Sequence, residues 1–266
     1  RYKKLKDLTI SSTNLGFAKN ISIVVPIEWQ KGTKNKFPLI IVFDKQNERS
    51  NNYILNTIDY LTSNEQIPSS IIISVASEQR YRYIETQYKI SDSKGLGLEN
   101  ENFLFDELVP LAEKEYNASS FKIFIGHSRY GYFTTSLFNN RINDLNAVIS
   151  MDPFFIQKNI SLTDSISELN KQIYHHKKYY RYGIGIDYLE DFFKMDSVLK
   201  KRIKNPSLDI KGSLFKEADH NAIPGLIIAV LFFFFKDYKT IELEKSKSLG
   251  EKITEKQKIK MSVSDI

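Results

Sequence analysis

The segment Phe121–Gly131, FKIFIGHSRYG, joins a short apolar stretch to a glycine, a serine and a second glycine. Its first five residues are β-branched or aromatic apart from one lysine, which predicts a strand. From Tyr130 onward the pattern predicts a helix, so Gly126-His127-Ser128 would form a tight turn between strand and helix. A serine in such a turn stands above the carboxyl edge of the sheet, beside the N–H groups of the helix N-terminus. The segment therefore indicates a nucleophilic serine, Ser128, with a helix N-cap as the alternative role.

One position departs from the G-x-S-x-G pattern that is usual for such a turn. Tyr130 occupies the place of the second glycine, and Gly131 follows one residue later. A bulky side chain there must point away from the neighbouring strand, or the turn must open slightly. We also expect Tyr130, so close to the serine, to contact substrate.

Around this segment, short apolar runs alternate with helical patterns along the chain. The expected strands are Asn20–Pro26, Phe37–Asp44, Ser70–Val75, Ala147–Met151, Tyr179–Ile186 and Leu208–Leu214. The expected helices are Asn51–Leu61, Phe103–Tyr116, Tyr130–Phe138, Ile166–His175, Phe192–Ile203 and Ile223–Phe235. This alternation predicts an α/β fold with a mostly parallel sheet covered by helices on both faces.

Composition excludes several classes of protein. The 266 residues are 41% hydrophobic, which is enough for a large core, and the absence of cysteine excludes disulfides and a thiol nucleophile. The net charge is +6, but 38 basic residues are interleaved with 32 acidic ones, so we expect a charged surface and no nucleic-acid partner. The longest apolar run, Gly225–Phe235, is too short for a membrane span, which needs about 20 residues. The chain begins with Arg1, so a removed signal segment is one expectation, and a periplasmic or secreted location is favoured over others.

A candidate base lies far downstream of the serine. Asp219-His220-Asn221 follows one expected strand and precedes the last apolar helix, which is where a catalytic histidine stands in the order serine, acid, histidine. His175 and His176 stand among lysines, as solvent-facing residues do. The acid is expected just after the strand Tyr179–Ile186, where three carboxylates follow one another: Asp187, Glu190 and Asp191.

Several further segments resemble one known family. They are Ile10–Pro26, an opening strand pair; Phe37–Asp44, a strand in which Lys45 follows in place of a glycine; Ile67–Tyr83, a strand and an arginine-bearing loop; Asn102–Tyr116, a helix; Met151-Asp152-Pro153; and Asp219-His220. Together with the serine turn, and over roughly residues 10 to 238, they resemble the α/β-hydrolase esterases that include esterase D-like and enterochelin esterase-like enzymes.

This resemblance implies the α/β-hydrolase fold and ester hydrolysis through an acyl-enzyme, with no metal or organic cofactor. Among the three carboxylates it favours Asp187, two residues past Gly185, as the partner of His220. It places one oxyanion donor at the backbone N–H of Arg129 and the second near Gln46. Residues 1–239 would form the esterase domain, and residues 240–266, rich in lysine and glutamate, a linker or the start of a C-terminal helical extension.

The substrate is expected to be a small-molecule ester, a siderophore ester or an acylated sugar. The long segment Ser77–Leu98 should border the site, with Arg80 or Arg82 facing an anionic or hydroxyl-rich substrate. Two other functions stay open. Tyr130 favours a catalytically impaired hydrolase-fold binding protein, and relatives of this fold include acyltransferases.

Overall fold

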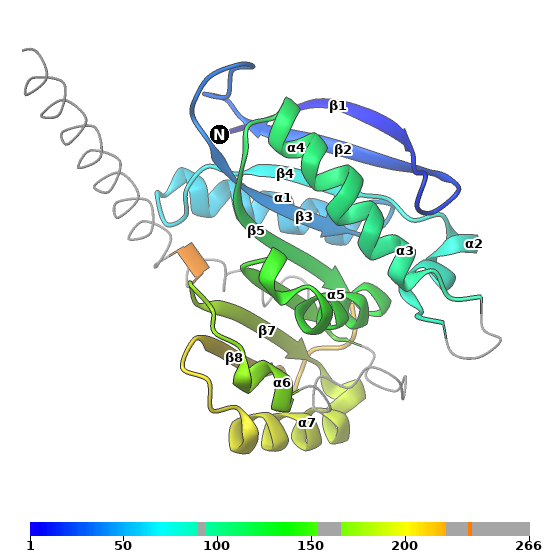
Figure 1. Cartoon of the computed structure of the whole chain (residues 1–266), viewed down its shortest axis with the longest axis vertical. Coiled ribbons are helices and arrows are strands. Elements are labelled where there is room, and N and C mark those ends of the chain that lie inside the picture. Colours follow the sequence, from blue (N-terminus) through cyan, green and yellow to red (C-terminus); the bar gives the residue numbers. More distant parts are fainter. Residues whose placement is uncertain (90–93, 154–165, 222–233, 236–266) are drawn as a thin grey trace, which may run out of the picture. The chain divides into compact units, whose positions relative to one another are not determined.

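The apolar runs form one eight-stranded sheet in the order β1-β2-β4-β3-β5-β6-β7-β8 (Figure 1). The structure is a computed structural model that describes residues 1–89, 94–153, 166–221 and 234–235. Its strands are β1 (Tyr2–Ser11), β2 (Ala18–Pro26), β3 (Phe37–Phe43), β4 (Ile71–Val75), β5 (Ala118–His127), β6 (Ala147–Met151), β7 (Lys178–Ile184) and β8 (Leu208–Leu214). Every strand expected from the sequence is present, within a few residues of its expected bounds.

Strand β1 is the strand that the apolar pattern did not predict; the family resemblance gave an opening strand pair only from Ile10 onward. It pairs antiparallel with β2, and β2 pairs antiparallel with β4, whereas all the other pairs are parallel. As an edge strand it is only half-buried and carries Lys3, Lys4 and Lys6, so no continuous apolar run marks it. Exposed lysines on an edge also discourage pairing with a second chain.

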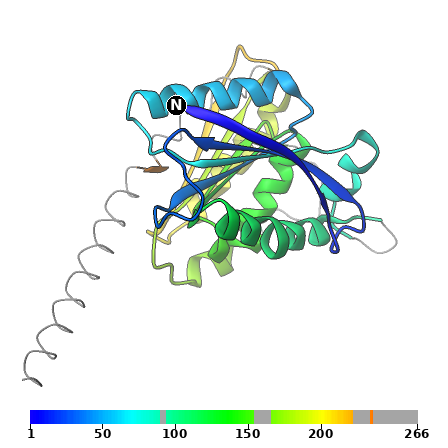
Figure 2. The same ribbon diagram turned by 90° about the horizontal axis from the view of Figure 1, so that it is seen from above.

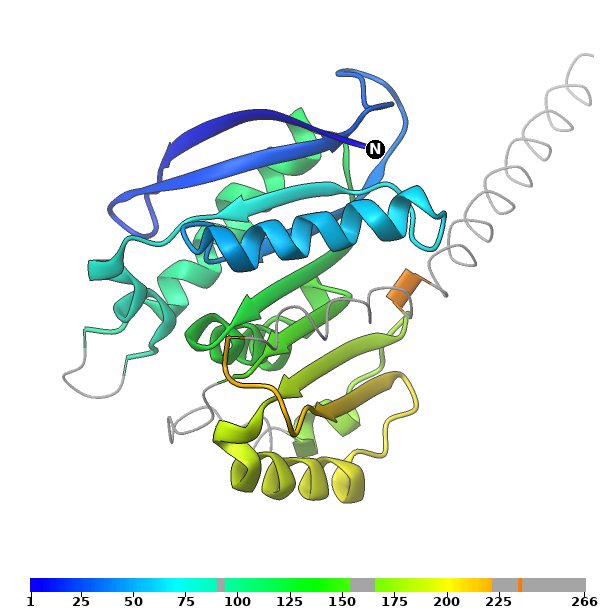
Figure 3. The same cartoon turned by 180° about the vertical axis from the view of Figure 1, so that it is seen from behind.

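Helices cover both faces of the sheet. Helix α1 (Glu48–Ser63) lies on one face, with Ile54, Ile58 and Leu61 buried, and α4 (Val109–Glu115) and α5 (Arg129–Asn140) lie on the other (Figures 1, 2 and 3). One continuous helical segment leads into α4, formed by α3 (Gly97–Asn102) and a π-helical stretch, Phe103–Leu108. The remaining helices are the short α2 (Gln79–Arg82), α6 (Ile166–Lys171) and α7 (Leu189–Arg202).

The core explains why the central strands read as unbroken apolar runs. All residues of β3, β4 and β6 are buried, since helices shield them from water on both sides. Because β3, β5, β6 and β7 run parallel, their carboxyl ends meet at a single edge of the sheet (Figure 1). Loops at that edge hold the residues singled out by the sequence.

The chain divides into two units, Arg1–Ala229 and Val230–Ile266. Most of the expected helix Ile223–Phe235 and all of the segment 240–266 lie outside the described residues, so the expected domain boundary at 239 stays a prediction. Among the residues that the structure describes, no helix is long and apolar enough to cross a membrane.

Candidate active site

Ser128 occupies a strained turn between β5 and α5. Its backbone has φ 57° and ψ −115°, a left-handed conformation that costs a non-glycine residue about 1–3 kcal/mol. Two hydrogen bonds hold it there: Ser128 N–H donates to the Met151 carbonyl (2.8 Å), and Tyr132 N–H donates to the Ser128 carbonyl (3.0 Å). A strained serine between strand and helix is the geometry of a nucleophile elbow.

The two glycines of the segment make this turn possible. A Cβ on Gly126 would lie 2.2 Å from the Tyr130 carbonyl oxygen, and a Cβ on Gly131 would lie 2.9 Å from the Met151 carbonyl oxygen. Gly126 therefore leaves room for the first turn of α5, and Gly131 lets that turn approach the end of β6. The close approach to the neighbouring strand is made one residue later than in the usual pattern, which leaves position 130 open to a large side chain.

The expected contact of Tyr130 with substrate is wrong. Its side chain is only 1% exposed, because the first turn of α5 directs it into the core. There its ring stacks on Phe43, with centroids 4.6 Å apart, and its hydroxyl donates a hydrogen bond to the Glu85 carboxylate. Tyr130 is thus buried among residues at and after the carboxyl ends of β3 and β4, and its side chain is not open to solvent.

A buried ionic cluster surrounds that hydroxyl. The Lys19 ammonium lies 2.8 Å from Glu85 Oε2, and the two side chains are 2% and 0% exposed. The Ser77 hydroxyl donates to the same carboxylate. Burial lowers the pKa of Lys19, and the charge of Glu85 opposes that shift. This cluster joins β2, the segment after β4 and the first turn of α5, and nothing in the local sequence pattern pointed to it.

His220 contacts a buried carboxylate that follows β6. Its Nδ1–H donates to Asp152 Oδ2, and the Asp152 side chain is 0% exposed. The other oxygen, Asp152 Oδ1, accepts the Gly185 N–H at 3.0 Å. With Nδ1 carrying the proton, the Nε2 atom of His220 carries the lone pair and is the atom that can accept one.

In the structure, the ring of His220 is paired with a carboxylate other than the one expected from sequence. Asp187 does lie beside His220, but its Oδ2 accepts the backbone N–H of His220 (3.2 Å), and the ring is held by Asp152. Glu190 is exposed to solvent, and the side chain of Asp191 lies outside the described residues. The family resemblance includes Met151-Asp152-Pro153 but gave Asp152 no role. Its position at the end of β6, the strand paired with β5, was the signal that could have identified it.

His127 fixes the other side of His220. The Nε2–H of His127 donates to the His220 carbonyl at 2.8 Å, and the two rings lie 4.5 Å apart. Burial, followed by the nearby charge of His220, lowers the pKa of His127, so it is neutral at pH 7. His127 was expected to serve only in the backbone of the turn. It holds the loop of the candidate base as well.

These contacts bring the candidate residues to one place. His127, which precedes Ser128, touches His220, and the Ser128 N–H is bound to Met151, which precedes Asp152. The serine, the histidine and the carboxylate thus lie at neighbouring strand ends of the same sheet edge.

The loop after β3 is held in a specific shape. Asp44 has a φ of 61°, Lys45 N–H donates to the Val75 carbonyl (3.1 Å), and Asn47 N–H donates to the Asp44 carbonyl (2.8 Å). The side chain of Gln46 donates to Asp44 Oδ1 and accepts the Ser77 N–H, both at 2.8 Å. Within the described part of the chain, the backbone N–H of Gln46 has no acceptor. The oxyanion role expected of Gln46 stays a prediction.

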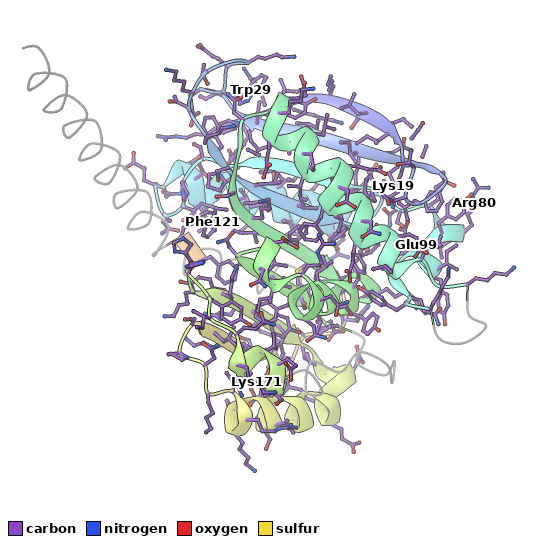
Figure 4. All side chains as sticks on the ribbon, in the orientation of Figure 1. Lys19, Trp29, Arg80, Glu99, Phe121 and Lys171 are labelled. Atoms are coloured by element: carbon purple, nitrogen blue, oxygen red, sulfur yellow. The ribbon has the colours of Figure 1, made fainter. Side chains whose placement is uncertain are left out.

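The two arginines of the segment Ser77–Leu98 have different surroundings. Arg82 donates twice to the Asp44 carboxylate, at 2.9 and 2.8 Å, and the hydrogen bond to Asp44 raises the pKa of its guanidinium. Arg82 thus braces the loop that carries Gln46, and its expected role toward substrate stays a prediction. Arg80 projects outward from α2 and is paired with Glu78 (Figure 4), and its role toward substrate stays a prediction.

The segment does border the serine turn. The Arg129 guanidinium, one residue past Ser128, lies over the ring of Tyr83, 4.0 Å from its centroid. Burial lowers the pKa of Arg129, and Tyr83 opposes that shift. A half-buried cation and an aromatic ring therefore stand next to the candidate nucleophile.

The fold resembles several solved structures. An IroE-like serine hydrolase from Shewanella oneidensis matches with a TM-score of 0.74 and 16% identity, over 89% of this chain and 81% of that chain. The BES protein from Bacillus cereus matches with a TM-score of 0.71 and 16% identity, over 86% of this chain and 95% of that chain. The enterobactin esterase FES from Shigella flexneri matches with a TM-score of 0.67 and 13% identity; the match covers 89% of this chain but only 60% of that one.

No family model matches the sequence, and no curated protein matches it either. The structural matches confirm the α/β-hydrolase fold that the sequence resemblance implied. The matched proteins include a serine hydrolase and an esterase, the classes of enzyme that the sequence resembled.

Proposed function

We propose that this α/β-hydrolase-fold chain is a serine esterase that cleaves carboxylic esters through an acyl-enzyme. One observation carries the proposal: a strained serine turn shares a sheet edge with a histidine whose Nδ1–H is bound by a buried aspartate. Ser128 is the nucleophile, His220 the general base and Asp152 the acid that orients it.

The reaction proceeds in two halves. His220 Nε2 takes the proton of the Ser128 hydroxyl while Oγ attacks the ester carbonyl, and the same proton then goes to the departing alcohol. Water next attacks the acyl-enzyme and gives a proton to His220, which passes it to Ser128 Oγ as the acyl–oxygen bond breaks and the carboxylic acid leaves. Asp152 stabilises the positively charged imidazole in both halves, since its buried carboxylate faces Nδ1.

Two backbone N–H groups would stabilise the oxyanion. The first belongs to Arg129, at the start of α5, where helical N–H groups have no acceptor within the helix. The second belongs to Gln46, whose loop is braced by Arg82 through Asp44. Such a donor typically lowers the barrier by about 3–4 kcal/mol.

His127 and Asp187 act as positioning residues in this proposal. Asp187 holds the N–H of His220 and His127 holds its carbonyl, so both ends of this residue are fixed by side chains from other strand ends. This fixation keeps the imidazole directed toward Asp152 although His220 itself stands on a loop.

The substrate is proposed only by class: an ester of a small molecule, of a siderophore or of an acylated sugar. Support comes from similar solved structures, which include a ferulic acid esterase, a siderophore hydrolase from Aspergillus nidulans and an enterobactin esterase. The cation and aromatic ring of Arg129 and Tyr83 beside the serine suit an acyl or alcohol group with polar or aromatic character. Tyr130 no longer favours a catalytically impaired binding protein, because its side chain is accommodated in the core.

Labelling by a fluorophosphonate and turnover of short p-nitrophenyl esters test the proposal. The wild-type chain should be labelled at Ser128 and should hydrolyse the esters. Ser128→Ala should abolish both. The matched control is Ser63→Ala, at an exposed serine in α1, and it should behave as wild type. Label found on another residue, or ester turnover that survives Ser128→Ala, would refute the assignment.

A further inference from the structure

A cavity lies at the edge of the sheet opposite to the one that carries Ser128. It has a volume of about 770 Å³ and is lined by Lys122 of β5, Asn146 just before β6 and Lys178 at the start of β7. Because these strands are parallel, their amino ends face away from the edge that carries Ser128 and Asp152. Ser128 follows Lys122 by six positions along the extended chain of β5, which corresponds to about 20 Å. The cavity, called the amino-edge pocket below, is therefore separate from the candidate active site.

The acidic groups of the amino-edge pocket are already paired. Glu113 lies 3.1 Å from the Lys122 ammonium, and Asp144 lies 2.7 Å from Nε of Arg141. In both pairs the carboxylate is the more exposed partner, at 42% for Glu113 and 49% for Asp144. These pairs leave one cation of the pocket without a carboxylate of its own.

That cation is Lys178. The residue is only 7% exposed, and its Nζ donates to the Leu145 carbonyl at 2.6 Å. Among the described residues, no carboxylate lies within ion-pair distance of it, and the Leu145 carbonyl accepts only one of its three ammonium protons. A buried ammonium without a counter-ion is unfavourable, and an anion entering the pocket would remove that cost.

Electrostatics agree with this geometry. Burial lowers the pKa of Lys178 to about 8, Asp144 raises it through space, and the like charge of Lys122 lowers it further. A bound anion would favour the charged form and raise the pKa again. Binding should therefore be accompanied by proton uptake near pH 8.

The remaining walls define the rest of the ligand. One side is apolar, formed by Phe105, Val109, Pro110 and Ile173. The Arg141 guanidinium lies over the ring of Phe105, 4.3 Å from its centroid, so the charged and apolar walls are adjacent. Among the lysines and arginines that line the cavity, Lys178 is the one without a carboxylate partner in the described part of the chain; the exposed His175 and His176 also line it. Such a cation next to an apolar wall suits one negative charge on an apolar body, and the volume is that of ordinary small-molecule sites.

We propose that the amino-edge pocket is a second binding site, for a small monocarboxylate with an apolar body, and that Lys178 is the residue that binds the carboxylate. The site does not depend on ester hydrolysis at Ser128. It lies on the amino side of the sheet and uses none of the residues proposed for catalysis.

Isothermal titration calorimetry with 4-phenylbutyrate tests this, with the neutral 4-phenylbutyramide and inorganic phosphate as comparison probes. Wild-type protein should bind the carboxylate roughly 10- to 100-fold more tightly than the amide, the range expected for a hydrogen bond to a charged group. At pH 8, titrations in buffers of different ionisation enthalpy should show uptake of about half a proton per ligand, since Lys178 is then half protonated. Phosphate should bind more weakly than the carboxylate because it gains nothing from the apolar wall.

Lys178→Met should lose the preference for the carboxylate, and Lys177→Met, at the exposed neighbour, should keep it. Circular dichroism and thermal unfolding establish that both variants are folded. Equal affinity for carboxylate and amide, absence of proton uptake at pH 8, or full binding by a folded Lys178→Met would each overturn the proposal. The first two measurements use wild-type protein, so they decide the matter even if Lys178→Met does not fold.

Discussion

Replacing Asp152 by Asn should impair catalysis far more than replacing Asp187 by Asn. Asp152 has two hydrogen-bond partners, the Gly185 N–H and the His220 ring, and together they fix the orientation that an asparagine side chain would take here. The Gly185 N–H, 3.0 Å from Oδ1, needs an acceptor, so the amide oxygen of the introduced asparagine would face Gly185 and its NH₂ group would face His220. The NH₂ group is a donor, so Nδ1 of His220 would become the acceptor and the proton would move to Nε2. The base would then hold the wrong tautomer to accept a proton from Ser128.

The expected loss follows from this change of tautomer and from the missing negative charge. In triads of serine, histidine and aspartate, the same substitution lowers kcat by about 10⁴-fold while the fold persists. Asparagine also tolerates the positive φ of 44° at position 152, so the variant should fold. Asp187 contacts only the backbone N–H of His220, and an asparagine oxygen can still accept that bond, so Asp187→Asn should lose less than about tenfold.

Values of kcat/KM for p-nitrophenyl butyrate, measured for the wild type and both variants, separate the two roles. Rates of inactivation by a fluorophosphonate give a second measure that does not depend on deacylation. Comparable losses in the two variants, or a larger loss in Asp187→Asn, would show that Asp152 is not the acid partner and that the sequence-based assignment was right.

Three further predictions concern the elbow and the tail. Ser128→Gly should be more stable than Ser128→Ala by about 1–2 kcal/mol in urea unfolding, because glycine adopts the positive φ of 57° without strain. Equal free energies of unfolding would show that the turn stores no backbone strain. His127→Ala should lower kcat more than it raises KM, with partial rescue in His127→Gln, whose amide can still donate to the His220 carbonyl; kinetics like those of the wild type would exclude a positioning role. Deleting Thr240–Ile266 should leave turnover of small esters nearly unchanged, and a variant that unfolds or is inactive would show that the tail is part of the domain.

Local patterns were enough to predict most of the strands and the serine turn. The short-range signals were the five residues before Gly126, which are apolar or aromatic apart from Lys122, and the glycines around Ser128. The structure has the strand β5 and the helix α5 where these signals predicted them. The pattern did not predict strand β1, because this exposed edge strand has lysines between its apolar residues and no continuous run of buried apolar residues. Its existence depends on pairing with β2, which is not a property of its own residues.

The pairing of the acid was hidden from the sequence for a different reason. Asp152 and Asp187 both follow a strand of the parallel sheet, and the sequence does not show which strand end lies under the His220 ring. The direction of Tyr130 was equally hidden, because it depends on a space between β3 and Glu85 that several distant segments form together. Both facts are properties of tertiary packing.

The buried cluster around Glu85 has an evolutionary consequence. Tyr130→Gly would restore the usual motif of the turn, but it would remove a partner of Glu85 and leave an empty space against Phe43. Loss of Lys19 alone would leave the Glu85 carboxylate buried without its positively charged partner. Substitutions at these positions are therefore epistatic: each is deleterious alone and tolerable only in combination. Among descendants of a common ancestor, lysine, glutamate and tyrosine should be inherited or replaced together, and this set would mark the lineage where overall identity has fallen too low to reveal it.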